Sequence, residues 1–421
     1  MEGPRLPLCR PRPGTAAALS LILLAIGAAS LPLQSAADEP PAAPPAPLEL
    51  TLGEALLRAL EHNPDLAVQR LNPTVMATFE DEEEAVFDPV LAAEASAGRE
   101  RTSPPSVGHQ DTTQAGIAAT LSKSTPAGTD IAVGLSTTRQ GSNQYTDAYV
   151  TRLGLTVNQA LLRGAGTDTN LATLRQARLD TLASDFELRG FAEALVATTE
   201  QTYWNLALSQ RTIDIVTNAL ALAEQNLRET RERIRVGILA ETEAAAAEAE
   251  VARRQESLIN ARSALQVTRL HLLRLLNLPG RGLGDDTLAL RTPPVTPDLS
   301  LDPVETYVEV AMRMRADLNQ ARLSLERREL ELVKTRNGLL PRLDLFVTLG
   351  KSGYAESFVN SLGNLPRRDY DVLAGLRLEF PPANRAAEAR HARAFATRQQ
   401  TELAIENLRR LVEEDVRAAY I

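Results

Sequence analysis

Residues 213–234 read IDIVTNALALAEQNLRETRERI, and this stretch decides the fold. Apolar or small side chains recur in it at alternating spacings of three and four, which is the a/d pattern of a coiled coil. These positions are Ile213, Val216, Leu220, Ala223, Leu227, Thr230 and Ile234. Gly237 follows and favours a turn, because glycine costs about 1 kcal/mol relative to alanine inside a helix. We therefore expect a long helix that ends just before Gly237.

The same spacing resumes after this turn. Its positions are Leu258, Ala261, Leu265, Thr268, Leu272 and Leu275, and Pro279 then ends the second helix. The two segments predict a helical hairpin with a shared apolar seam. The pattern is equally typical of an ordinary helical hairpin and of a coiled-coil assembly, so both remain open at this point. A later helix continues the pattern with Leu318, Leu325 and Leu332.

Working outward from the hairpin, two short segments resemble each other. Residues 50–66 read LTLGEALLRALEHNPDL, in which Thr51 and Glu54 have the spacing of a capping box. Residues 302–318 read DPVETYVEVAMRMRADL, in which Asp302 is a candidate N-cap and Pro303 suits the first helical position. Aligning the two Asp-Leu pairs, residues 65–66 and 317–318, gives an offset of 317 − 65 = 252 residues. The chain is therefore predicted to contain a repeat.

After each of these segments the periodicity changes from helical to alternating. The alternating apolar residues are Ile131, Val133, Leu135, Leu153, Leu155 and Val157 in the first half, and Leu343, Leu345, Val347, Leu349, Val372, Ala374, Leu376, Leu378 and Phe380 in the second. Their polar neighbours include Asp344, Thr348, Asp371, Arg377 and Glu379. Such alternation indicates by default a half-buried strand of an antiparallel sheet, and it is also found in a strand that separates lipid from a water-filled barrel. Periodicity alone leaves both open.

The N-terminus has the pattern of an export signal. Arg5, Arg10 and Arg12 precede an apolar run, residues 16–26, and Ser35-Ala36-Ala37 has the small residues of a cleavage site. We expect residues 1–37 to be a signal peptide and residues 38–48 to be a Pro-rich linker. Cys9 is the only cysteine, so the mature protein is expected to contain none.

Composition excludes several other classes of protein. The chain has 421 residues and a net charge of −9, which gives no reason to expect a nucleic-acid partner. The four histidines are scattered without the spacing of a metal site, and no nucleophile motif is present. We expect no catalytic residue, no cofactor and no metal, and therefore no enzyme.

In the order of its segments and in its motifs, the mature chain resembles the TolC-like outer membrane factor family of efflux and secretion channels. The matching segments are residues 50–66, 157–164, 236–243, 340–343 and 381–387. The resemblance implies a mainly α fold with transmembrane β strands, in which long coiled-coil helical hairpins form a periplasmic α-barrel. The resemblance also implies a β-barrel in the outer membrane that is shared among three protomers. In this family the hairpin tips dock on a periplasmic adaptor, so the resemblance assigns docking to Gly237, Thr242 and Glu243.

Three departures from the family stand out. One is Pro382-Ala383, which stands where the family commonly has a leucine-glycine pair. Residues 90–158 have room for about four strands, where the family usually supplies two, with Pro126 and Gly128 as turn signals for the extra hairpin. The second half stops at Ile421, before a second hairpin, so we expect either a fragment truncated at the C-terminus or a protein that cannot close the usual helical barrel. The second tip usually carries the gate residues of the family, so the resemblance assigns no gate residue here. The expected division is repeat 1 at residues 49–281, an inter-repeat linker at 282–301, and an incomplete repeat 2 at 302–421.

The favoured function is an outer-membrane channel subunit of a tripartite efflux or type I-like secretion system. Its implied partners are two further copies in a homotrimer, a periplasmic adaptor (membrane fusion protein), an inner-membrane pump and outer-membrane lipid. The alternative is a periplasmic coiled-coil scaffold, or a degenerate relative that does not conduct.

Overall fold

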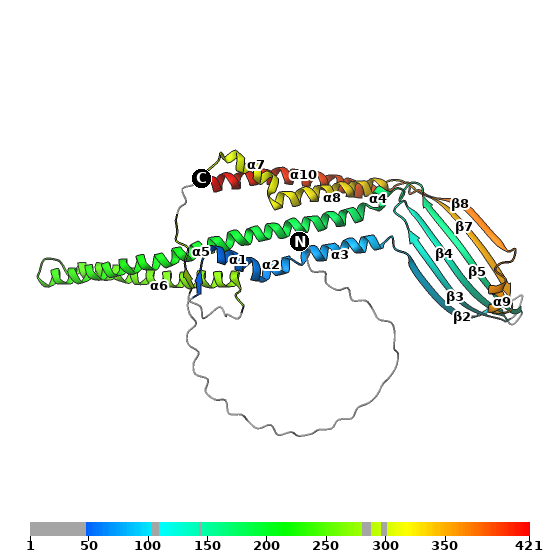
Figure 1. The fold of residues 1–421 in the computed structure, drawn as a ribbon, viewed down its shortest axis with the longest axis horizontal. Coiled ribbons are helices and arrows are strands. Elements are labelled where there is room, and N and C mark those ends of the chain that lie inside the picture. The colour runs from blue at the N-terminus through cyan, green and yellow to red at the C-terminus, as the bar shows by residue number, and fades with distance from the viewer. Residues whose placement is uncertain (1–47, 103–108, 143–144, 280–287, 296–300) are drawn as a thin grey trace, which may run out of the picture. The chain divides into compact units, whose positions relative to one another are not determined.

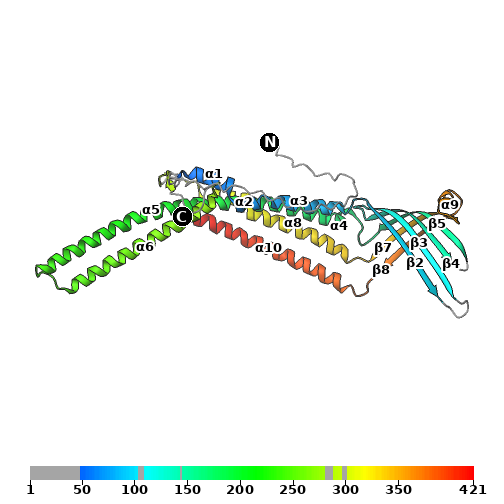
Figure 2. The same ribbon diagram turned by 90° about the horizontal axis from the view of Figure 1, so that it is seen from below.

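The computed structural model describes residues 48–102, 109–142, 145–279, 288–295 and 301–421. The expected signal peptide and all but the last residue of the Pro-rich linker lie outside these residues. Among the described residues, the larger of two sheets has six strands. Figure 1 shows this sheet at one end of a group of helices, and Figure 2 shows the same arrangement from below. Within the described part of the chain, no helix has an apolar run long enough to cross a lipid bilayer.

The first half begins with β1 (Leu48–Leu50) and three helices, α1 (Leu52–His62), α2 (Pro64–Gln69) and α3 (Asn72–Ala85). Four strands follow, β2 (Val90–Thr102), β3 (Gln110–Ser124), β4 (Thr129–Ser142) and β5 (Tyr145–Ala160). After α4 (Thr167–Asn170), the helices α5 (Ala172–Arg235) and α6 (Thr242–Leu276) form a long hairpin. The prediction of about four strands in this half is confirmed, and the extra turn contains Pro126 and Gly128 as expected, the latter at a φ of 84°.

The second half contains β6 (Leu288–Leu290), α7 (Val304–Met314), α8 (Ala316–Gly338), β7 (Arg342–Ala355), α9 (Phe358–Gly363), β8 (Tyr370–Glu379) and α10 (Arg385–Tyr420). The strand β6 was not predicted, because it lies in the segment expected to be a plain linker. Its three residues pair in parallel with β1, more than two hundred residues earlier in the chain.

The hairpin of α5 and α6 packs through the predicted seam. Every seam residue of α5 is half-buried, whereas its neighbours Ile215 and Leu222 are each 67% exposed. On α6, Leu258, Leu272 and Leu275 are buried and the other seam positions are half-buried. The alternating three-four spacing therefore identified the face that each helix presents to the other.

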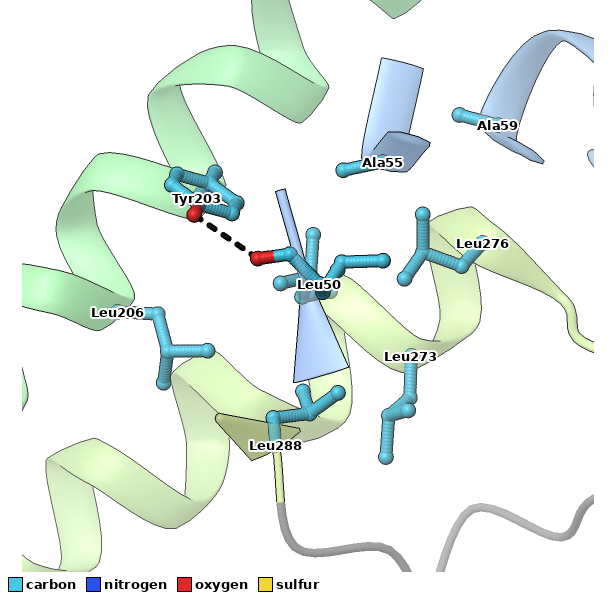
Figure 3. Packing of buried hydrophobic residues seen from close by; sticks show 9 residues of the cluster. Leu50, Ala55, Ala59, Tyr203, Leu206, Leu273, Leu276 and Leu288 are labelled. Atoms are coloured by element: carbon cyan, nitrogen blue, oxygen red, sulfur yellow. Dashed lines mark hydrogen bonds between the residues drawn. The ribbon is translucent and has the colours of Figure 1, made fainter. Parts of the chain in front are cut away.

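A compact apolar core lies where α1 crosses the hairpin, and Figure 3 shows it closely. Its buried residues are Leu50, Ala55, Ala59, Tyr203, Leu206, Leu272, Leu273, Leu276 and Leu288. The Tyr203 hydroxyl donates to the Leu50 carbonyl at 3.1 Å and accepts from the Thr292 amide at 3.2 Å. This core joins β1 and α1, the hairpin and β6.

The two segments that were predicted to repeat, residues 50–66 and 302–318, each contain a junction between two helices with the same backbone conformation. Asn63 follows α1 with φ −63° and ψ 122°, and Arg315 follows α7 with φ −59° and ψ 130°. These residues lie 315 − 63 = 252 positions apart, which is the offset found in the sequence. Their neighbours Leu66 and Leu318 are both buried.

One predicted cap is present and the other is not. Thr51 and Glu54 form the full capping box, with each side chain accepting from the other residue's amide at 3.2 and 3.0 Å. The assignment of Asp302 as an N-cap was wrong, because α7 begins at Val304 and Pro303 occupies the capping position without a side-chain hydrogen bond. Since Pro303 has ψ 140°, it extends the backbone away from the helix instead of starting it.

Candidate functional site

The six strands form one antiparallel sheet in the order β2-β3-β4-β5-β7-β8. Directly paired residues on neighbouring strands point to the same face of a sheet. One such row takes a single residue from each strand, Leu91, Leu121, Val133, Leu155, Leu349 and Val372. All six are apolar, and none is buried, with Leu91 at 73% and Val372 at 61% exposure. This face of the sheet is apolar and uncovered in the middle.

The rows on either side extend the apolar face. They include Ile131 opposite Val157, and Leu135 opposite Leu153, as the alternation predicted. Two lysines interrupt the face, Lys123 on β3 and Lys351 on β7. A lysine can lay its apolar stem along such a surface and carry its ammonium group to the nearest water.

The opposite face of the sheet is polar and rich in small residues. The row next to the apolar one contains Ala92, Thr120, Gly134, Gly154, Gly350 and Asp371, and the next contains Glu94, Ala118, Ser136, Arg152 and Ser352. The polar residues predicted on β7 and β8 also lie on this face, with Asp344 paired to Arg377. The sheet therefore separates an apolar side from a polar side.

An ion pair crosses a whole strand on this polar face. Arg152 on β5 donates twice to Asp371 on β8, with both N–O distances at 2.6 Å, and β7 lies between them. Gly350 of β7 permits the pair, because a Cβ there would lie 2.4 Å from the Asp371 Oδ1. The pairing of Arg152 with Asp371 could not be predicted from the sequence, since only the strand register brings these residues together.

The short helix α9 packs against the apolar face near its far end. The buried hydroxyls of Thr151 and Ser361 lie 2.7 Å apart. Gly353 makes room for α9, because a Cβ there would lie within 2.1 Å of the Ser361 carbonyl oxygen. On α9 itself, Phe358 and Val359 are 50% and 74% exposed, so the covered end of the face remains apolar.

The turn between α5 and α6 lies at the end of the hairpin farthest from the sheet (Figure 1). Gly237 lies in this turn, and Thr242 and Glu243 begin α6. Gly237 has a φ of 77°, and the Ile238 amide donates to the Arg233 carbonyl at 2.8 Å while the Gly237 amide donates to the Ile234 carbonyl at 2.9 Å. This is a Schellman motif, and its left-handed residue favours glycine. All three predicted docking residues are exposed. Val236 and Ile238 add apolar surface, at 58% and 71% exposure.

Other chemistry has little support in the described residues. Among them, no three His, Cys, Asp or Glu side chains gather as a metal site requires. His391 contacts the Thr335 hydroxyl at 3.1 Å, and His62 contacts the Arg58 carbonyl at 3.3 Å, so these two rings take part in local packing.

Comparisons with known proteins find solved structures with a similar fold. No protein-family model matches the sequence, and no curated protein matches it. Among solved structures, the outer-membrane channel OprN matches with a TM-score of 0.61 at 19% identity, covering 87% of this chain and 73% of that one. The CmeC outer membrane channel of Campylobacter jejuni matches with a TM-score of 0.56 at 16% identity, covering 86% and 70%.

The outer membrane protein VceC of Vibrio cholerae matches with a TM-score of 0.52 at 17% identity, covering 84% of this chain and 75% of its own. At these identities a match shows the fold. The chain therefore has the fold of these outer-membrane proteins, as its resemblance to TolC-like outer membrane factors predicted.

Proposed function

We propose that the chain is an outer-membrane channel subunit of a tripartite efflux or type I-like secretion system, and that it acts as a passive conduit without catalysis. The observation that carries this proposal is the apolar row across all six strands, in which five residues are exposed and Leu155 is half-buried, with a polar face behind it. A sheet in water has no reason to leave an apolar residue uncovered on each of six strands. A sheet with lipid on one side and water on the other requires that division.

The height of the apolar face agrees with this proposal. On β7 the face runs from Leu343 to Gly353, a separation of 353 − 343 = 10 residues. At about 3.3 Å per residue and a tilt of about 40°, ten residues rise about 25 Å. The lipid-facing band of outer-membrane barrels has about this height.

The edges of the sheet support assembly from several copies. Within the described residues, β2 and β8 each have one neighbouring strand, and lipid cannot satisfy the hydrogen-bonding groups of an open edge. The strands alternate in direction, so β8 of one copy can pair antiparallel with β2 of the next. Three copies of six strands would close a barrel of eighteen, within the range of about 8 to 26 that outer-membrane barrels show.

The helices below the sheet have matching free edges. Contacts run from α3 to α5, from α5 to α8 and from α8 to α10, in the same order as the strands. The outer helices expose large apolar residues, Val75 and Phe79 on α3 and Phe395 and Leu403 on α10, each 48–62% exposed. We propose that these edges meet between copies in a homotrimer, so that a helical barrel extends from the sheet into the periplasm.

At the hairpin tip, we propose docking of a periplasmic adaptor, which in turn joins an inner-membrane pump. The exposed Thr242 and Glu243, next to exposed Val236 and Ile238, offer a polar and apolar surface to such a partner. Gly237 sets the turn that presents them. Substituting Gly237 by alanine is expected to weaken adaptor capture without loss of outer-membrane assembly.

Two adjacent substitutions on β5 test the proposed membrane face. Leu155→Arg places a charge on the apolar face and is expected to cost about 2–4 kcal/mol near the bilayer midplane, reducing outer-membrane assembly. Thr156→Arg, one residue away, places the same charge on the polar face and is expected to preserve assembly. The measurement is the amount of detergent-extracted oligomer in the outer-membrane fraction. Equal assembly of both variants would contradict the proposal.

A further inference from the structure

A groove between α5, α8 and α10 gathers basic side chains. Its lining includes Arg327, Arg328 and Lys334 from α8, and Arg390 and Arg393 from α10. Glu331 is the only acidic residue in this lining. The chain as a whole carries a net charge of −9, so this excess of positive charge runs against the average of the molecule.

Two of these five cations already have carboxylate partners. Arg327 pairs with Asp180 of α5 at 2.9 Å, and Lys334 lies 3.7 Å from Glu331. The buried amide of Gln176 holds Glu331 in place, with an N–O distance of 3.2 Å. The acids near the groove are therefore engaged by Arg327 and Lys334.

Three guanidinium groups are left. Within the part of the chain that the structure describes, Arg328, Arg390 and Arg393 have no carboxylate partner. The Nε of Arg328 is buried and has no hydrogen-bond acceptor. A buried donor without an acceptor is unfavourable, and cations that line one groove without carboxylate partners repel one another.

We infer that this groove is a binding site for a phosphate-bearing anion. The planar guanidinium group donates pairs of parallel N–H bonds to phosphate oxygens, and several such groups around one point suit an anion with more than one charge. An anion in the groove would also provide an acceptor for the Arg328 Nε. The groove lies within one copy of the chain, so the site itself does not depend on assembly.

The phosphate could belong to a soluble compound or to a lipid headgroup. The groove lies among the helices, which under the proposed function stand in the periplasm and outside the bilayer. We therefore infer that the anion is soluble. This choice of source rests on the proposed function, whereas the inference that the groove binds a phosphate group does not.

Calorimetric titration of the purified full chain with pyrophosphate, at constant ionic strength, tests the site. The double variant Arg390→Gln/Arg393→Gln is expected to bind pyrophosphate at least about tenfold more weakly, because charge-assisted hydrogen bonds are lost. Both residues are exposed, so the fold should survive, and circular dichroism checks this. The matched control is Arg409→Gln/Arg410→Gln, which removes two exposed charges from the same helix outside the groove and is expected to bind as the wild type does.

Several results would overturn the inference. These are no pyrophosphate binding by the wild type, equal loss of affinity in the groove and control variants, or full displacement by chloride at the same ionic strength. Tighter binding of short-chain phosphatidylglycerol than of pyrophosphate, lost in the groove variant, would overturn the choice of a soluble anion. Failure of the membrane-face test would leave each of these readouts unaffected.

Discussion

The two halves of the chain build the same helix–helix junction in different ways. In the first half, Asn63 is buried, accepts from the Leu66 amide at 3.0 Å and donates to the Leu275 carbonyl at 3.1 Å. In the second half, Arg315 takes the equivalent place and pairs with Asp317 and Asp415, both at 2.8 Å.

The surroundings of the two junctions explain this difference. The hairpin of α5 and α6 covers α1, which buries Ala55 and Ala59, whereas α7 buries none of its residues. A covered junction favours a neutral side chain with all its hydrogen bonds satisfied, while a half-buried junction tolerates charges that water can reach. The same backbone bend is therefore stabilised by a buried helix cap at Asn63 and by ion pairs that water can reach at Arg315.

The substitution expected to cost most stability truncates a side chain in the core that covers the first junction. Leu272 lies in the core beneath α1 and is fully buried, so Leu272→Ala is expected to lower the free energy of unfolding by about 2–5 kcal/mol. Val310→Ala on α7, where Val310 is 46% exposed, is expected to change it by less than about 0.5 kcal/mol. Urea unfolding followed by circular dichroism measures both. If Val310→Ala lowered the free energy of unfolding by as much as Leu272→Ala does, the distinction between a covered α1 and an uncovered α7 would be contradicted.

The next effect concerns the hydroxyl that joins three segments in the core. Tyr203→Phe leaves the ring in place but removes the donor to the Leu50 carbonyl and the acceptor of the Thr292 amide. The expected loss is about 1–3 kcal/mol, because a buried polar group is left without a partner. The same urea titration measures it, and an unchanged unfolding midpoint would contradict the role given to this hydroxyl.

A direct comparison of the two junctions should give a smaller difference. Asn63→Ala is expected to cost about 1–2 kcal/mol, since it removes a helix cap and leaves the Leu66 amide unpaired. Arg315→Gln is expected to cost about 0–1 kcal/mol, because its side chain is 34% exposed and its ion pairs are screened by water. The reverse order in a urea titration would contradict the distinction between a buried cap and exposed ion pairs.

The smallest expected effect is a pH dependence confined to α1. The Thr51 amide and then the Thr51 hydroxyl donate to the Glu54 carboxylate and lower its pKa in the folded chain. A carboxyl with a lowered folded-state pKa contributes stability above its unfolded pKa of about 4.3, and this contribution fades as the pH falls through the folded value. Glu54→Gln is expected to remove this acid-dependent part of the unfolding curve. The segment before α7 has no such cap, so Glu309→Gln, at an exposed position of α7, is the control and should leave the curve unchanged.

Much of this architecture could be predicted from local patterns. The spacing of Leu220 and Leu227 identified the hairpin seam, and alternation around Leu155 identified the apolar face. Thr51 and Glu54 are three residues apart, so their capping box is a local signal as well. These features depend on residues close in the sequence, which is why a single sequence contains enough information to find them.

Features that depend on distant residues could not be predicted. The pairing of β1 with β6 involves three residues in each strand, too few for a periodic pattern to appear. The Arg152–Asp371 pair depends on the register of three strands and on Gly350 between them. The groove around Arg328 requires three helices to meet, although each helix alone shows only ordinary surface arginines.

If the apolar face of the sheet meets lipid and the polar face meets water, labels at successive residues of β5 should alternate between the two surroundings. Because Cys9 is the only cysteine and lies in the expected signal peptide, single cysteines can be introduced at residues 152–157 and labelled with a fluorophore. Brominated lipid should quench labels at Leu153, Leu155 and Val157, while iodide should quench those at Arg152, Gly154 and Thr156. Quenching by iodide alone at all six positions would contradict the account, since it would place water on both faces.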